Sequence, residues 1–294
     1  MHKFIIALLI VLLLIPCYTQ GETTPFRPSE TEGYTFTYQG CTAVVHRVQS
    51  GDNSLHGVFY FPNHFDESQQ YPVLIFSHGY NSNSYADTDY VPYLTELGII
   101  CYKFDFAGGS IRSRSGGDFL QMSLLTEKAD LLAVIDDITS QPFVDPERAA
   151  LIGMSQGGVV TGLTAPEVSD RILGEILVYP AFNILDEVRA RYTSPEELPD
   201  ELLLLNQYVG RRYFADVWDM DLSAEAARYT GPVMLIHGTA DRLVNHQHSI
   251  DAAAQFDNAR LLLLDGAPHG FGKKEVAALM TELLAFLQET GLIP

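Results

Sequence analysis

The chain has 294 residues, of which 18 are basic and 37 acidic, so its formal net charge is −19. This charge repels phosphate backbones and anionic lipid surfaces, and it argues against a nucleic-acid partner. The length allows one large α/β domain or two small ones with a substantial core. No C-x-x-C ligand spacing is present, and we expect neither a metal nor a cofactor.

The first 21 residues have the pattern of a secretory signal peptide. A short charged start is followed by an unbroken apolar run over residues 4–15, and residues 16–21 break the pattern. The run is shorter than the ~20 residues of a membrane span, so we expect a secreted or periplasmic protein without stable membrane insertion. A retained N-terminal anchor, or a lipoprotein attached through Cys17, is the alternative.

Residues 22–33 are rich in Thr, Pro and Glu and are predicted to form a flexible tether. The folded domain is predicted to span residues 34–294 and to begin with an antiparallel hairpin of residues 42–48 and 55–61.

Short apolar runs then alternate with stretches of helical periodicity. Six runs are apolar almost throughout, as in parallel strands covered on both faces: residues 73–77, 99–104, 149–154, 175–179, 233–237 and 261–264. Five stretches show 3.6-residue periodicity: residues 90–97, 124–138, 157–163, 248–256 and 276–289. This alternation predicts a doubly wound α/β domain with a mostly parallel sheet.

Residues 181–229 interrupt this alternation, because they separate two strands by more than one crossover helix requires. The segment has ten acidic and five basic residues, but also apolar side chains such as Tyr213, Phe214 and Trp218. We interpret it as an inserted lid. A helical insertion without substrate contact is the alternative.

The sequence leaves open whether the cysteines form a disulfide. Cys41 and Cys101 remain after signal removal, and a secreted protein could bridge them. Cys101 lies in a predicted buried strand, where cysteine commonly serves as a small apolar residue, and this favours free thiols.

The sequence GMSQGG at residues 153–158 matches G-x-S-x-G and lies between a predicted strand and a predicted helix. A sharp strand-to-helix turn forces its serine into a strained backbone and leaves the hydroxyl exposed above the sheet. The context predicts that Ser155 is a nucleophile.

A serine nucleophile needs an imidazole to take its proton and a carboxylate to orient that imidazole. Asp241 follows the penultimate predicted strand and His269 follows the last one, which places both at the carboxyl edge of the sheet. The chain order Ser155, Asp241, His269 is that of an α/β-hydrolase triad.

The other candidates for these roles are less suitable. The residues His78 and His237 lie at strand ends and are predicted to be structural, and His246 and His248 open a surface helix. Asp265 is a rival for the acid, and Asp105 is expected to brace the Gly108–Gly109 loop.

An oxyanion formed at the attacked carbonyl must meet fixed donors. One is predicted to be the backbone N–H of Gln156, directly after the nucleophile. The second is predicted to be the backbone N–H of Tyr80, in the loop after the strand of residues 73–77.

Five motifs in this order resemble the α/β-hydrolase superfamily: SHGY at 77–80, FDFAGGS at 104–110, GMSQGG at 153–158, HGTAD at 237–241 and PHGF at 268–271. Within it the chain is most similar to the bacterial cinnamoyl (feruloyl) esterase-like group. Members of that group carry a compact insertion after the sixth strand and hydrolyse carboxylic esters, including hydroxycinnamate esters. The resemblance implies an α/β-hydrolase fold and the same three catalytic residues and two oxyanion amides. Residues 110–122 lack the simpler G-x-G turn of many relatives, so contacts of that loop are not carried over.

The leading hypothesis is a secreted serine carboxylesterase that forms an acyl-enzyme on Ser155. Its substrate is expected to be a small-molecule or carbohydrate-linked ester, and the sequence leaves the oligomeric state open. A prolyl oligopeptidase-like peptidase is the second hypothesis, although little chain precedes the catalytic sheet to form a propeller. A lipase is disfavoured by the acidic insertion. A non-enzymatic binding protein is disfavoured because the triad is complete.

Overall fold

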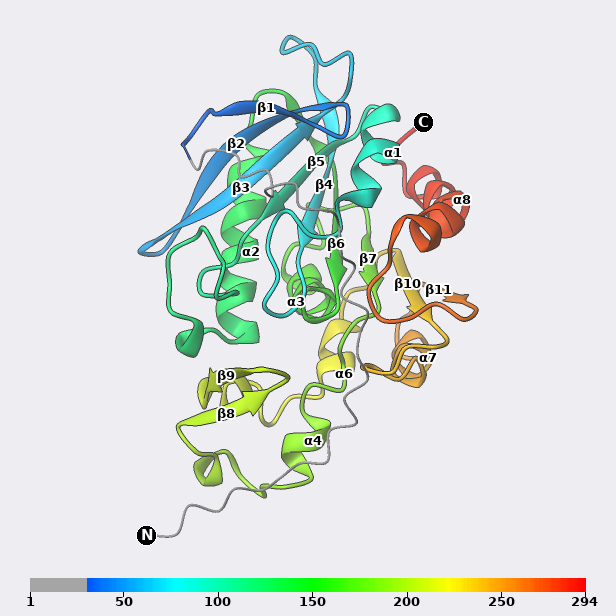
Figure 1. Ribbon diagram of the computed structural model, residues 1–294. Coiled ribbons are helices and arrows are strands. Elements are labelled where there is room, and N and C mark those ends of the chain that lie inside the picture. Colours follow the sequence, from blue (N-terminus) through cyan, green and yellow to red (C-terminus); the bar gives the residue numbers. More distant parts are fainter. Residues whose placement is uncertain (1–30) are drawn as a thin grey trace, which may run out of the picture.

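A nine-stranded sheet forms the centre of the molecule in the computed structural model, which describes residues 31–294 (Figure 1). The strand order is β1-β2-β3-β5-β4-β6-β7-β10-β11. The strands are β1 (Thr35–Tyr38), β2 (Cys41–Ser50), β3 (Asn53–Phe61), β4 (Tyr71–Ser77), β5 (Ile100–Phe104), β6 (Val144–Met154), β7 (Glu175–Val178), β10 (Val233–Gly238) and β11 (Ala259–Leu264). In this order, neighbouring strands from β1 to β5 pair antiparallel. Neighbouring strands from β5 to β11 pair in parallel.

The predicted α/β-hydrolase fold is therefore present, with its mostly parallel sheet and its N-terminal hairpin of β2 and β3. Strand β1 was not predicted. It pairs with β2 at the sheet edge, where its outward-facing residues are exposed and supply little apolar signal.

Two hydrophobic cores lie on the two faces of the sheet. Along β4 the side chains alternate, so that Val73 and Ile75 belong to one core and Leu74 and Phe76 to the other. Helices α2, α3 and α7 cover the first core, and α1 and α8 cover the second (Figure 1). The helices are α1 (Val91–Glu96), α2 (Leu124–Thr139), α3 (Gln156–Thr164), α7 (Gln247–Ala253) and α8 (Lys273–Glu289).

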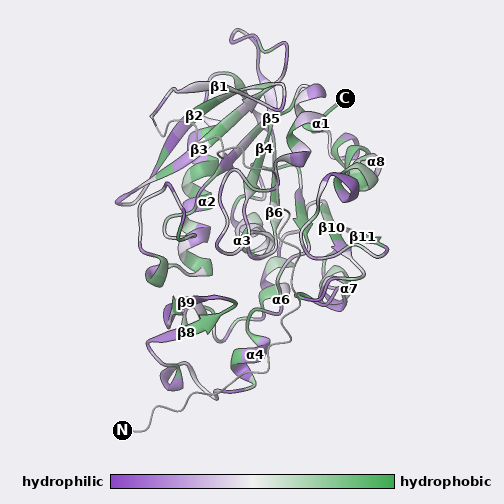
Figure 2. Ribbon diagram, viewed as in Figure 1, coloured by the Kyte–Doolittle hydropathy of each residue, from purple (hydrophilic) through white to green (hydrophobic). Residues whose placement is uncertain are grey.

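The central strands are apolar on both faces, as Figure 2 shows by their green colour. The edge strand β11 differs, because its residues are mostly half-buried. Its apolar residues 261–264 are nevertheless sufficient to predict a strand.

The insertion forms a small subdomain below the carboxyl ends of β6 and β7 (Figure 1). It contains α4 (Asp186–Arg189), the 3₁₀ turn η4 (Pro195–Glu197), the hairpin β8 (Glu201–Leu204) and β9 (Gln207–Gly210), α5 (Arg212–Ala215) and α6 (Leu222–Ala226). Several of its apolar side chains join the first core, including Tyr213, Phe214 and Val217. The insertion is therefore packed onto the main domain, while Leu203 and Tyr208 of its hairpin are exposed.

The described residues begin within the predicted tether; the predicted signal peptide and residues 22–30 lie outside them. The tether's last residues are bound to the domain. Glu32 accepts hydrogen bonds from His46 and from the backbone N–H of Arg47, and the N–H of Gly33 donates to the carbonyl of Val45. Residues 32 and 33 are thus hydrogen-bonded to β2, and the tether stays a prediction.

Both described cysteines are free and buried. The Cys41 Sγ lies 3.0 Å from the Thr95 hydroxyl, and Cys101 lies in β5 as predicted. Within residues 31–294 no helix has the length and apolar character to cross a membrane.

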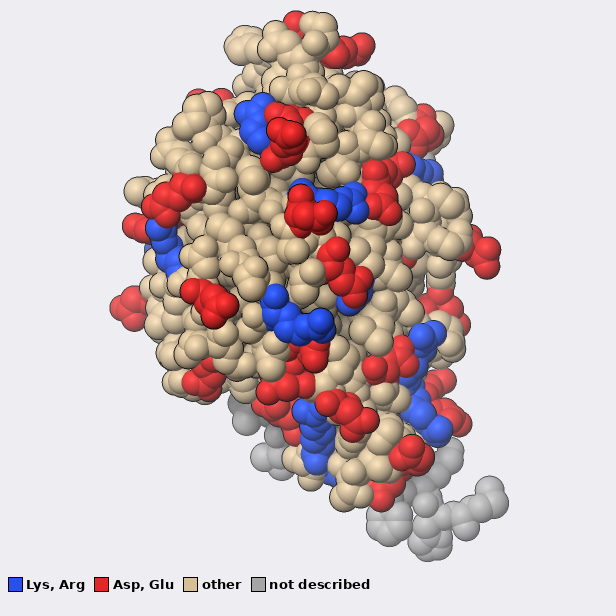
Figure 3. Space-filling view, turned by 180° about the vertical axis from the view of Figure 1, so that it is seen from behind, with Lys and Arg blue, Asp and Glu red and all other residues tan. Residues whose placement is uncertain are grey.

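Charged side chains are spread over the face of the molecule seen in Figure 3, and many of its Lys and Arg side chains lie beside Asp or Glu. Close ion pairs of this kind include Lys128–Glu167 and Arg171–Asp136, each with an N–O distance of 2.6 Å. Such exposed pairs contribute little to stability.

Glu175 at the start of β7 is fully buried, and neither of its carboxyl oxygens has a hydrogen-bond partner among the described residues. Burial raises the pKa of this carboxyl from 4.5 to about 8. The folded protein therefore retains a proton that the unfolded chain releases between these values. Stability must decrease as the pH rises through this range.

We predict that Glu175→Gln removes this part of the pH dependence. The variant should be more stable than the wild type at pH 8, by up to about 4 kcal/mol, and similar to it near pH 4.5. Urea unfolding at both pH values measures the difference. Glu147→Gln, at an exposed position of β6, is the control and should leave the pH dependence unchanged. A stability difference that does not vary with pH would contradict the prediction.

Candidate active site

Ser155 occupies the turn between β6 and α3, as the sequence predicts. Its backbone has φ 54° and ψ −118°, a conformation that L-residues rarely adopt. Its N–H donates to the carbonyl of Val178 at 2.9 Å, and its carbonyl accepts from Ala181 at 3.1 Å. Hydrogen bonds to the end of β7 and the start of the insertion thus hold the strained residue in place.

The glycines around Ser155 are required by close backbone contacts. A Cβ on Gly153 would lie 2.2 Å from the Gly157 carbonyl oxygen. A Cβ on Gly157 would lie 2.3 Å from the carbonyl oxygen of Ser77 and 2.4 Å from that of His78. These distances are too short for any side chain, so α3 can approach the end of β4 only with glycine at this position.

The structure brings the three predicted catalytic residues into one hydrogen-bonded chain. The Oγ of Ser155 lies 3.0 Å from Nε2 of His269, and Nδ1 of His269 lies 2.6 Å from Oδ2 of Asp241. Asp241 follows β10 and His269 lies in the loop after β11, so three separate strand ends supply them. With Nδ1–H donating to Asp241, Nε2 is free to accept the serine proton.

The carboxylate of Asp241 is held by several donors. Its Oδ1 accepts hydrogen bonds from the backbone N–H groups of Leu243 and Val244 at 2.8 and 2.9 Å. Its Oδ2 accepts one from Nε2 of His237 at 3.1 Å, in addition to the one from His269. Burial acts to raise the pKa of Asp241, but the hydrogen bonds from His237, His269 and Val244 outweigh it and hold the pKa well below its usual range. Asp241 is therefore ionised and fixed in orientation at neutral pH.

His237 is structural, as expected, but its partner is the catalytic acid candidate itself. The ring is fully buried, and its Nδ1 lies 2.7 Å from the Ser249 hydroxyl. In the sequence, the available indication of this contact was that His237 lies at the end of a strand, four residues before Asp241.

The two residues predicted to donate to the oxyanion both lie near Ser155. Gln156 is the first residue of α3, so its backbone N–H has no acceptor within the helix. Gly79 lies next to Ser155, because a Cβ there would be 3.2 Å from the Cβ of Ser155. The peptide group that joins Gly79 to Tyr80 carries the N–H of Tyr80.

His78 fixes the direction of that peptide. Its Nε2 accepts the N–H of Phe106 at 3.2 Å, which leaves Nδ1–H to donate to the Gly79 carbonyl at 2.8 Å. Burial lowers the pKa of His78, in keeping with a neutral ring. In a trans peptide the C=O and N–H point in opposite directions. Holding the Gly79 carbonyl therefore also sets where the Tyr80 N–H points.

The rival residues lie elsewhere. Asp265 is bonded to Thr239 at 3.1 Å rather than to His269, and His248 forms an ion pair with Asp186 at 3.5 Å. Asp105 braces the loop after β5 that contains Gly108–Gly109, as expected, but it does so through Arg114. Its oxygens accept the N–H groups of Arg114 in this loop and of Ser84 in the loop after β4.

Tyr179 is a site residue that the sequence did not indicate. It follows β7 with φ 39°, and its buried ring lies 4.7 Å from the ring of His269 and 4.8 Å from that of Phe271. It packs against the imidazole and limits its movement. The only available signal was its place between a strand and Pro180.

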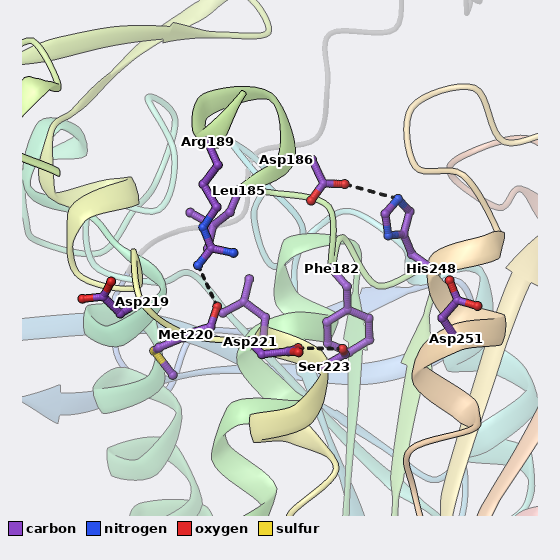
Figure 4. A pocket seen from close by; sticks show the side chains of 11 residues that line it. Phe182, Leu185, Asp186, Arg189, Asp219, Met220, Asp221, Ser223, His248 and Asp251 are labelled. Carbon is purple, nitrogen blue, oxygen red and sulfur yellow. Dashed lines mark hydrogen bonds and ion pairs between the residues drawn. The ribbon is translucent and has the colours of Figure 1, made fainter. Parts of the chain in front are cut away.

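A cavity of about 440 Å³ lies between the insertion and α7 (Figure 4). Its lining includes Phe182, Leu185 and Arg189, and Arg189 donates to the carbonyls of Trp218 and Met220. None of the five predicted catalytic and oxyanion residues lines this cavity. Within residues 31–294 no group of three His, Cys, Asp or Glu side chains is arranged to hold a metal ion.

A family model described as the prolyl oligopeptidase family matches residues 86–291, which include all three residues of the hydrogen-bonded chain. The chain belongs to the prolyl oligopeptidase family. It is a serine hydrolase of the α/β-hydrolase type, as its motifs indicated.

Two curated relatives of this family member are of uncharacterised function. YcjY of Escherichia coli K12 is 33% identical over 135 residues, which cover 45% of this chain and 42% of YcjY. YfhR of Salmonella typhi is 27% identical over 248 residues, which cover 81% of this chain and 75% of YfhR. The chain thus matches less than half the length of YcjY.

Among solved structures, Est1E from Butyrivibrio proteoclasticus with bound ferulic acid is similar in fold. Its TM-score is 0.72 at 24% identity, over 81% of this chain and 99% of Est1E. The expected likeness to the feruloyl esterase group is confirmed at the level of the fold.

We predict that Gly157→Ala in this family member disrupts the site. The new methyl group would push α3 away from the end of β4, and so move Ser155 relative to His269. We expect a fall in kcat/KM of about 100-fold or more and a loss of about 1–3 kcal/mol in stability. Ester hydrolysis and urea unfolding measure the two effects.

Gly158→Ala is the matched comparison, because its Cβ would meet the Gly153 carbonyl oxygen and the Pro180 Cβ at 3.1 Å, contacts that are about 0.8 Å longer than those of a Cβ on Gly157. It should be affected much less. Equal effects of the two substitutions would contradict this account of the turn.

Proposed function

We propose that the protein is a carboxylesterase that acts through an acyl-enzyme on Ser155. The observation that carries the proposal is the chain from Ser155 Oγ through His269 to Asp241, with distances of 3.0 and 2.6 Å. A hydroxyl with a hydrogen-bonded, carboxylate-oriented imidazole is the arrangement that nucleophilic catalysis requires.

The reaction proceeds in two halves. His269 Nε2 takes the proton of Ser155 as Oγ attacks the carbonyl carbon of the ester. The oxyanion that forms is stabilised by the backbone N–H groups of Tyr80 and Gln156. Collapse of this intermediate breaks the bond to the alcohol, which leaves with the proton from His269.

Water then completes the cycle. His269 removes a proton from water as it attacks the acyl group on Ser155. Collapse of the second tetrahedral intermediate breaks the bond to Ser155 Oγ, which takes the proton back from His269, and the carboxylic acid is released. The fixed, ionised Asp241 stabilises the imidazolium in both halves.

Two observations support an aromatic ester as substrate. The half-buried ring of Tyr80, the residue whose backbone N–H is assigned to the oxyanion, lies 5.9 Å from that of Phe119, and such rings offer stacking contacts to a planar acyl group. Est1E, which has this fold, binds ferulic acid. We therefore propose hydroxycinnamate esters as the substrate class.

Peptide hydrolysis is the second candidate, and membership of the prolyl oligopeptidase family is the observation that favours it. The same nucleophile, base and oxyanion donors serve both reactions. Only the binding of the groups beside the scissile bond separates them.

For localisation, we propose that residues 1–21 direct export and are then removed. N-terminal sequencing of the protein recovered from its native host tests this, since a mature chain that retains residue 1 would contradict it.

We predict that the wild type labels with a fluorophosphonate probe and that Ser155→Ala does not. Ester turnover in the variant should fall by about 10⁴-fold or more, because the nucleophile is removed. A fluorescent probe read on a gel and a p-nitrophenyl acetate assay measure the two effects. Unlabelled wild type, or full turnover in Ser155→Ala, would refute the serine mechanism.

The substrate class is tested by comparing kcat/KM for four substrates: p-nitrophenyl acetate, a long-chain p-nitrophenyl ester, methyl ferulate and an aminoacyl-proline anilide. We expect methyl ferulate to be the preferred natural-type substrate and the anilide to be the poorest. A higher kcat/KM for the anilide than for methyl ferulate would instead establish the peptidase candidate.

A further inference from the structure

The side chain of Gln156 links the insertion to the main domain directly behind the nucleophile. It is buried, and its Oε1 accepts the hydroxyl of Tyr213 in α5 at 2.5 Å. Its Nε2 donates to Oε2 of Glu127 in α2 at 2.7 Å. The Gln156 amide is therefore held at both ends by residues from two different elements.

The hydrogen bonds of Gln156 with Tyr213 and Glu127 are compatible with a buried, uncharged environment. Glu127 and Tyr213 are both buried, and burial raises the pKa of Glu127 to about 8. A neutral carboxyl at pH 7 needs no counter-ion here. Donors and acceptors alternate from Tyr213 through Gln156 to Glu127, and the Gln156 Nε2 also donates to Sδ of Met122 at 3.7 Å.

Tyr213 also contacts the other proposed oxyanion residue. Its ring lies 6.1 Å from that of Tyr80, at an interplanar angle of 73°. The Tyr80 hydroxyl donates to the carbonyl of Leu204 in the insertion hairpin at 3.3 Å. Both residues whose backbone N–H groups are assigned to the oxyanion are thus held through their side chains by the insertion.

We propose that Tyr213 is a positioning residue for the oxyanion hole, and that through it the docking of the insertion controls turnover. This rests on the proposed function, because it assumes that the Gln156 and Tyr80 amides stabilise the oxyanion. Without the Tyr213 hydroxyl, the buried Oε1 of Gln156 lacks its donor and the side chain must reorient. Small displacements of groups that meet the reacting atoms are enough to slow a reaction strongly.

The first test is Tyr213→Phe, which removes one oxygen atom and keeps the ring contact with Tyr80. We expect kcat per active site to fall about 10-fold or more, with KM within about twofold, because the oxyanion forms only during the reaction. Titration with the fluorophosphonate gives the concentration of active sites. This removes any effect of a smaller folded fraction.

The matched control is Tyr229→Phe. Tyr229 is also a buried tyrosine at the end of the insertion, but its hydroxyl has no hydrogen-bond partner among the described residues. Its kcat and KM should equal those of the wild type. A wild-type kcat in Tyr213→Phe, or an equal loss in both variants, would overturn the positioning role.

A second readout reports on the oxyanion hole itself. A trifluoromethyl ketone forms a tetrahedral adduct with Ser155 whose oxygen occupies the oxyanion site. Its inhibition constant should rise in Tyr213→Phe by the same factor by which kcat/KM falls. A lower melting temperature with an unchanged inhibition constant would show a structural role alone and overturn the proposal.

A double-mutant cycle tests whether Tyr213 acts through Gln156. In a Gln156→Leu background, Tyr213→Phe should have little further effect on kcat, since the link is already broken. An undiminished loss in that background would contradict the proposed route. If the wild type itself neither labels nor hydrolyses esters, both proposals fail together. A labelled, fully active Tyr213→Phe overturns the positioning role alone.

Discussion

The strained backbone of Ser155 is the constraint on which the rest of the site depends. A positive φ at a non-glycine residue is unfavourable, so the surrounding chain must hold it there. Hydrogen bonds from the end of β7 and the start of the insertion do this, and glycines at 153 and 157 allow β4 and α3 to come close. The same turn exposes Oγ to His269 and begins α3 at Gln156, whose N–H has no acceptor within the helix.

The insertion is part of this arrangement rather than a separate cover. It begins at the residue that donates to the Ser155 carbonyl, and its helix α5 returns to contact Gln156 from the other side. Buried apolar side chains fix it to the first core. A segment anchored in this way holds both residues whose N–H groups are proposed to bind the oxyanion. This gives a physical reason for the proposed effect of the insertion on rate.

Much of the fold and site could be predicted because both have local signals. The parallel strands are apolar runs, and the loops at their ends carry Ser155, Asp241 and His269 in a recognisable order. The links of Gln156 to Glu127 and Tyr213 could not be found in this way, because they join segments 29 and 57 residues away from Gln156. A glutamate in an amphipathic helix normally faces solvent, and nothing near Glu127 in the sequence indicates its burial.

Trapping the acyl-enzyme tests the central claim most directly. Acid quenching during turnover of an activated p-nitrophenyl ester stops deacylation, and peptide mapping by mass spectrometry then locates the acyl group. We expect one acyl group per chain, on the peptide that contains Ser155, and none when His269 is replaced by alanine. Turnover without an acyl-protein, or an acyl group on another residue, would contradict the account.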